Sequence, residues 1–145
     1  MVRGILSNNI QKLVTIEEVI MNKAELLTRL DILLEQEVIA KEAYDITVLA
    51  FEQLVETIQM NNLEQAEMLF THLPSALTRM NTDEEVERPA QVIMEEIESS
   101  PHFPKAKAQV DFVEKKWGKE FPIGEREYLY MHYTTVIQMN QGGEE

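Results

Sequence analysis

The fold class is decided by one uninterrupted segment, residues 63–80, which reads LEQAEMLFTHLPSALTRM. Its apolar side chains recur every three or four residues, as on one face of an α-helix. They are Leu63, Ala66, Leu69, Phe70, Leu73, Ala76, Leu77 and Met80. Asn62 stands where a helix N-cap is favoured, and Pro74 is expected to remove one backbone hydrogen bond and bend the axis. The segment therefore predicts an amphipathic helix that packs against other elements.

The same helical period continues on both sides of this segment. Helices are predicted over residues 9–21 (a short, weak one), 24–35 and 40–60 before it, and over 89–98, 104–117 and about 125–139 after it. Asn22 is expected to cap the helix that follows it, and Gly118 to end the second-last helix. Glycine and proline number five each and cluster at segment ends, and no stretch alternates as a strand would. The sequence predicts an all-α fold, a single compact antiparallel helical bundle of five to six helices without a sheet.

The domain organisation follows from the same pattern. The helical domain is predicted to span residues 24–139, with no internal boundary. Residues 1–23 are expected to form an N-terminal extension or a short helix, and residues 140–145 a flexible tail.

The charge balance argues against several classes of partner. The 145 residues carry 26 acidic against 13 basic side chains, a formal net charge of −13. Direct nucleic-acid binding and binding to anionic membranes are therefore not expected, because both need a basic face. The absence of cysteine excludes disulfides and thiolate metal sites. Residues 1–22 lack the apolar core of a signal peptide or a membrane span, so a cytoplasmic location is expected by default.

Histidines are the candidate functional residues. His72 lies at the edge of the apolar face of segment 63–80, with Arg79 two helical turns further on. A neutral imidazole is a nucleophile that can accept a phosphoryl group, and an arginine could stabilise the added phosphate. His132, on the last predicted helix, shares a face with Leu129 and Val136, and with Glu125 two turns earlier. Taken singly, each is better interpreted as a histidine at the edge of the core without a role. His102, in a turn between Pro101 and Phe103, is interpreted as a loop residue.

The sequence predicts neither a metal or other cofactor nor an enzyme. A di-metal site in a helical bundle needs Glu-x-x-His pairs, but the residues three before the histidines are Leu69, Ser99 and Leu129. No glycine-rich phosphate loop and no Gly-x-Ser-x-Gly motif is present. The acidic pairs are interpreted as solvated faces.

Three segments together resemble a known family. Residues 69–80, LFTHLPSALTRM, resemble the first histidine motif of the PTS regulation domain (PRD), through which the bacterial phosphoenolpyruvate-dependent sugar phosphotransferase system controls sugar-operon regulators. Residues 93–97 and 103–106, IMEEI and FPKA, are similar to the middle of such a domain. Residues 117–132, WGKEFPIGEREYLYMH, resemble its second histidine motif. The resemblance covers about residues 25–138.

The resemblance implies a function as well as a fold. It implies a helical bundle that forms a homodimer, and phosphorylation of His72 and His132 by the phosphocarrier protein HPr or a sugar-specific enzyme II B component. Arg79 would stabilise the phosphate. A single copy without a nucleic-acid reader would act through a protein partner, a transcription regulator or another effector. The alternative is a non-phosphorylated helical interaction or scaffold module.

The sequence also ranks the two histidines. No acidic residue adjoins His72, whereas Glu125 and Glu127 precede His132 by seven and five residues. Carboxylates disfavour a nearby phosphate. His72 is therefore expected to be the more readily phosphorylated. The apolar stripes of segments 40–60 and 63–80 look wide for one small bundle, which adds to the expectation of a homodimer.

Overall fold

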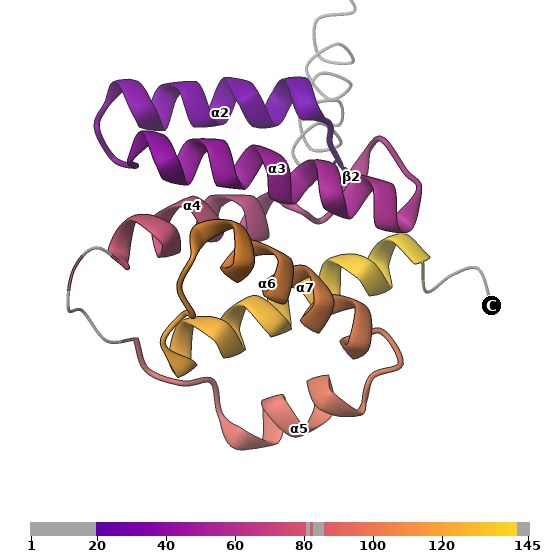
Figure 1. The fold of residues 1–145 in the computed structure, drawn as a ribbon. Helices are drawn as coiled ribbons and strands as arrows, with labels where there is room; N and C mark the ends of the chain where they lie inside the picture. The colour runs from indigo at the N-terminus through magenta and orange to yellow at the C-terminus, as the bar shows by residue number, and fades with distance from the viewer. Residues whose placement is uncertain (1–19, 81, 83–85, 142–145) are drawn as a thin grey trace, which may run out of the picture.

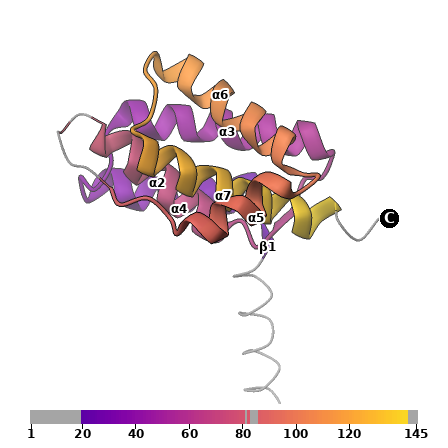
Figure 2. The same ribbon diagram turned by 90° about the horizontal axis from the view of Figure 1, so that it is seen from below.

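The computed structural model describes residues 20–80, 82 and 86–141, and within them the fold is an all-α bundle, as predicted (Figure 1). The helices are α2 (Lys23–Glu35), α3 (Lys41–Ile58), α4 (Glu67–Arg79), α5 (Gln91–Ser99), α6 (Phe103–Trp117) and α7 (Ile123–Gln141). α3 packs against α2, α4 and α6, while α7 packs against α4, α5 and α6. Seen from below, α7 and α5 run side by side along the underside of the bundle (Figure 2). α4 and α6 thus each contact both central helices.

The core lies between the apolar faces predicted for α3 and α4. Phe51 of α3 meets Phe70 of α4 edge to face, with ring centroids 5.1 Å apart, and Leu54 and Leu73 are fully buried in the same core. The stripes that looked wide are therefore largely covered within one chain. Their width is not an argument for a dimer.

The prediction that the fold contains no sheet is wrong for one short antiparallel ribbon. β1 (Ile20–Met21) pairs with β2 (Leu63–Glu64), with Met21 opposite Leu63. The predictions of a helix through Met21 and of a helix beginning at Leu63 are wrong at these positions. Gln65 adopts a left-handed backbone conformation with φ of 59°, which breaks a helix, so α4 begins only at Glu67 and Asn62 does not cap it.

The end of α7 also differs from the prediction. Asn140 was expected in a flexible tail, but it is helical and buried. Its Oδ1 accepts from the Glu64 backbone N–H at 2.9 Å, and its Nδ2 donates to the carbonyls of Glu64 at 3.1 Å and Val136 at 2.7 Å. Burial and three hydrogen bonds hold this residue in the helix. Residues 142–145, and residues 1–19 of the expected N-terminal extension, lie outside the described part of the chain.

Several local predictions are confirmed. Asn22 caps α2, because its Oδ1 accepts from the Glu25 backbone N–H at 2.9 Å. α6 ends at Gly118, which is left-handed with φ of 89°. His102 lies in the turn before α6.

Among the described residues, no helix is long and apolar enough to span a bilayer.

Candidate functional site

The fold brings His72 and His132 together. His72 comes from α4 and His132 from α7, and their ring centroids lie 5.3 Å apart. Both side chains are partly buried. The helices carrying them pack against each other, so residues sixty positions apart in the sequence share one site. His102 belongs to another region, at the start of α6.

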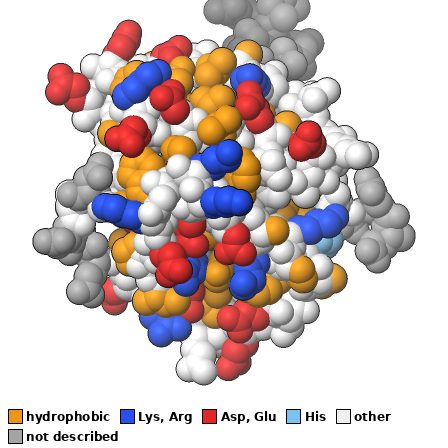
Figure 3. Space-filling view, in the orientation of Figure 1, with side chains coloured by type: hydrophobic (Ala, Val, Ile, Leu, Met, Phe, Trp, Pro, Cys, Tyr) orange, Lys and Arg blue, Asp and Glu red, His pale blue; other side chains and the backbone are white. Residues whose placement is uncertain are grey.

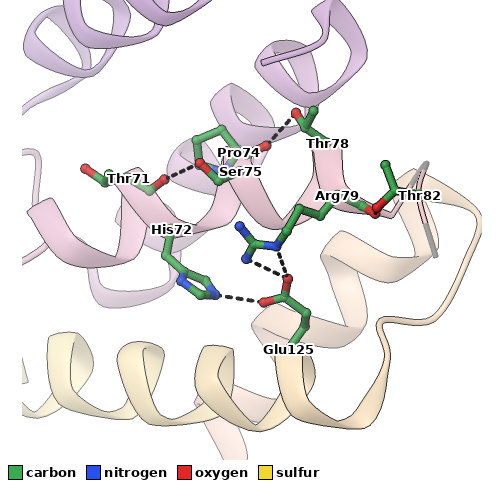
Figure 4. A network of polar contacts seen from close by, with 8 residues as sticks. All are labelled: Thr71, His72, Pro74, Ser75, Thr78, Arg79, Thr82 and Glu125. Carbon is green, nitrogen blue, oxygen red and sulfur yellow. Dashed lines mark hydrogen bonds and ion pairs between the residues drawn. The ribbon is translucent and has the colours of Figure 1, made fainter. Parts of the chain in front are cut away.

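Glu125, in the first turn of α7, joins His72 to Arg79 (Figure 4). Its Oε1 lies 3.0 Å from Nε2 of His72, and its Oε2 accepts from Nε of Arg79 at 2.8 Å and lies 2.6 Å from Nη2 of Arg79. Only 3% of the Glu125 side chain is exposed, against 23% of His72 and 32% of Arg79. One buried carboxylate thus ties two residues of α4 to α7.

The ionisation of Glu125 determines which ring nitrogen of His72 carries a proton. Burial by itself would raise the pKa of Glu125, but the hydrogen bonds from His72 and Arg79 outweigh it and hold that pKa below its ordinary value. An ionised carboxylate can only accept hydrogen bonds. Nε2 of His72 therefore carries a proton and donates it to Glu125, and in the neutral ring the lone pair resides on Nδ1.

His132 is held neutral. Burial, and to a smaller extent the neighbouring His72, lowers the pKa of His132 to about 4. Near neutral pH this imidazole therefore keeps a free lone pair, which a nucleophile needs.

Both histidines line one pocket. The other lining residues are Met68, Val86, Glu87, Tyr128 and Met131, so the walls are mainly apolar. Tyr128 also faces His72, with ring centroids 6.3 Å apart. Gly124 allows this arrangement, since a Cβ on it would lie only 2.0 Å from the carbonyl oxygen of Val86. The segment at Val86 can therefore cross the first turn of α7 beside the histidines.

The structure corrects the electrostatic comparison of the two histidines. Glu125 was expected to act on His132, but it contacts His72 instead. Seven helical residues separate Glu125 from His132 by about 10 Å along the axis, whereas α4 runs alongside its first turn. The ranking of the two histidines assumed that no acidic side chain lies beside His72. This assumption is wrong.

Glu127 is also not the free negative charge that was expected near His132. Its carboxylate binds Arg88 through two hydrogen bonds, from Nε at 2.9 Å and from Nη2 at 2.8 Å. The bidentate ion pair balances the charge of Glu127. Glu127 and Arg88 line a different pocket, beside α5.

Sequence reasoning missed the bridging role of Glu125. Its place seven residues before His132 indicated a shared helix face, but its partners lie on another helix. No sequence signal within α7 could have identified His72 and Arg79 as those partners.

Within the described residues no group of three or more histidine, cysteine or acidic side chains is placed to hold a metal ion.

Charge on the molecular surface is mixed. On the face shown in Figure 3, lysine and arginine side chains lie among acidic and apolar ones rather than in one continuous patch. The ion pairs of the described residues include Lys23 with Glu52 and Arg29 with Glu67. This face offers no continuous basic surface to a phosphate backbone.

A comparison with family models identifies the domain. The model of the PRD domain matches residues 44–136, more than half of the chain and a range that includes both histidines, Arg79 and Glu125. Neither the search of curated proteins nor that of solved structures found a match. PRD domains are PTS regulation domains, regulatory rather than catalytic. The resemblance seen in the sequence is thereby confirmed, and the chain belongs to the PRD family.

Proposed function

We propose that this chain is a cytoplasmic regulatory phosphoacceptor module of the bacterial sugar phosphotransferase system. His72 and His132 receive phosphoryl groups from HPr or from an enzyme II B component. The observation that carries the proposal is the pairing of the two imidazoles, 5.3 Å apart, beside Arg79. Membership of the PRD family supports the same role.

The chemistry requires little more than these side chains. The lone pair of a neutral imidazole forms a bond to the phosphorus of a donor phosphohistidine, and the P–N bond to the donor ring breaks with its electron pair returning to that ring. Arg79 binds the same carboxylate as His72, that of Glu125. Its guanidinium is the cation that can instead form hydrogen bonds to the phosphate.

The regulatory output follows from the bridge at Glu125. A phosphoryl group adds nearly two negative charges and competes with Glu125 for Arg79. Because this carboxylate joins α4 to α7, its displacement would alter the packing of these helices. That change would reach a transcription regulator or another protein effector through the surface of the domain or through a homodimer.

The direct test is phosphoryl transfer from labelled phosphoenolpyruvate through enzyme I and HPr, with and without enzyme II B components. Wild type should take up acid-labile label, and the double variant His72→Ala/His132→Ala should take up none. His102→Ala is the matched control, since this histidine lies outside the pair, and it should label like wild type.

The single variants rank the two acceptors. His72 is still expected to label faster, now because Arg79 lies beside its site and because burial acts strongly on His132. Full labelling of His72→Ala with loss in His132→Ala would contradict this order.

The second candidate is a helical interaction or scaffold module without phosphorylation. It is favoured by one observation: the contacts of Glu125 with His72 and Arg79 are already complete without a phosphate. If no donor labels the wild-type protein, the phosphoacceptor proposal fails and this candidate replaces it.

A further inference from the structure

The two candidate acceptors occupy the same small space. With centroids 5.3 Å apart, the two rings lie within the screening distance of physiological salt, about 8 Å. Each phosphoryl group carries nearly two negative charges near neutral pH. Their mutual repulsion would act across a partly buried pocket, where water screens charges less than in bulk solvent.

The pocket supplies little positive charge to offset that repulsion. The described residues that line it include an acidic one, Glu87, and no lysine or arginine. Arg79 is not among the residues that line the pocket, and it is bound to Glu125. The nearby Arg88 is engaged with Glu127 through two hydrogen bonds. One guanidinium can therefore compensate one phosphate, and only by leaving its carboxylate.

We propose that the His72–His132 pair holds one phosphoryl group at a time, so that either histidine, once phosphorylated, suppresses phosphorylation of the other. The inference rests on the proposed function and makes it more specific. The domain is then a two-state switch with two alternative acceptors, rather than a counter of two successive phosphorylations. Two donors acting on different histidines would compete for one site.

Each transfer is balanced in itself. The lone pair of the accepting nitrogen forms the new P–N bond, while the donor, a phosphohistidine of a carrier protein, loses its phosphoryl group and keeps the bonding pair on its ring nitrogen. The second ring remains unmodified. It adds no negative charge to the pocket.

The first test is the stoichiometry of the wild-type protein. We expect intact-mass spectrometry at alkaline pH, with saturating phosphoenolpyruvate, enzyme I and HPr, to show one added phosphoryl group per chain. The doubly modified form should stay at least tenfold below the singly modified one. His72→Gln and His132→Gln should each still accept one group, which shows that both acceptors work.

The second test separates charge from the loss of a ring. Replacing His72 by Glu places a negative charge where the phosphate would be, whereas His72→Gln does not. Labelling of His132 should be at least tenfold slower in His72→Glu than in His72→Gln, and the reciprocal pair at His132 should act in the same way on His72. Circular dichroism shows whether all four variants fold alike.

The outcomes distinguish this inference from the proposed function. A wild-type protein that accumulates mainly in the doubly phosphorylated form overturns mutual exclusion and leaves the phosphoacceptor role intact. The same conclusion follows if only one histidine accepts phosphate in the single variants, since exclusion would then have no second site to act on. If no phosphate is taken up from any donor, both proposals are wrong.

Discussion

At the scale of single residues, Glu125 determines the geometry of the candidate site. It is almost completely buried, and its two oxygens face different partners, His72 and Arg79. A buried carboxylate is tolerated only when such partners compensate its charge. The same contacts orient the His72 ring, so the position of the acceptor depends on this one acidic side chain.

Replacing Glu125 by Gln should destabilise the domain by about 2 kcal/mol, the range for hydrogen bonds to charged groups. The amide cannot accept at both ends, and its NH2 group would face the N–H donors of His72 or Arg79. Urea unfolding measures the change. The control is Glu52→Gln, which removes an exposed ion pair with Lys23 and should cost less than about 1 kcal/mol. Equal losses in the two variants would contradict the role assigned to Glu125.

The lowered pKa of His132 predicts a specific pH dependence of stability. The folded state holds the pKa at about 4, whereas the ordinary value is 6.5. Between these values the unfolded chain binds up to about one proton more, so the free energy of unfolding falls as the pH drops from 6.5 towards 4. His132→Gln should flatten this slope, and His102→Gln should not. An NMR titration of His132 with a midpoint near 6.5 would refute the prediction.

At the scale of elements, α7 is the helix on which two parts of the fold depend. Its first turn carries Glu125, which binds α4, and its last turn carries Asn140, which binds the backbone of β2. His132 lies between these two anchors. α7 therefore links the histidines to the β1–β2 ribbon through the hydrogen bonds of Asn140.

Asn140→Ala should loosen this ribbon. Three hydrogen bonds are lost and the Glu64 N–H loses its partner, so we expect a destabilisation of about 1–3 kcal/mol. Hydrogen exchange should show faster exchange of the Glu64 amide than in wild type. Gln138→Ala, at an exposed position of the same helix, should leave both quantities unchanged. Unaltered exchange at Glu64 in Asn140→Ala would show that the side chain does not hold the ribbon.

At the scale of the whole molecule, several large apolar side chains remain exposed on the surface of the bundle. The wide faces of α3 and α4 are used within the chain, but α5 exposes Val92 by 69% and Ile93 by 43%, and Met68 of α4 is 68% exposed. Exposed apolar side chains of this size are frequent at protein interfaces. Together with membership of the family, they support a homodimer as the form that responds to phosphorylation.

Light scattering at tens of micromolar, an assay concentration suited to weak dimers, should report a dimer that buries more than about 1,000 Å². Val92→Asp should shift it towards monomer if α5 lies in the interface, because a buried unpaired charge is costly. Leu49→Asp is the control, an exposed apolar residue on α3. A monomeric wild-type protein at this concentration would count against the dimer.

Much of this protein could be predicted from the sequence because its helices depend on local information. The apolar period, the Asn22 cap and the Gly118 stop each act within a few residues, so the helical class and most boundaries follow from them. The histidines were singled out for the same reason, by their chemistry and by short motifs around them. At Leu63 and Asn140 the local pattern predicted another conformation, because tertiary contacts determine the structure at these positions.

The arrangement of the site was decided only by the tertiary structure. The 5.3 Å approach of His72 to His132, the pairing of Glu125 with His72 and Arg79, and the neutralisation of Glu127 by Arg88 all join residues distant in sequence. Spacing along one helix predicts which residues share a face, but it does not predict which other helix that face meets. The sequence by itself determined a helical domain with two candidate acceptors. The packing of α4 on α7 made these two histidines neighbours. Their electrostatic interaction depends on this packing, because charges act through space and not along the chain.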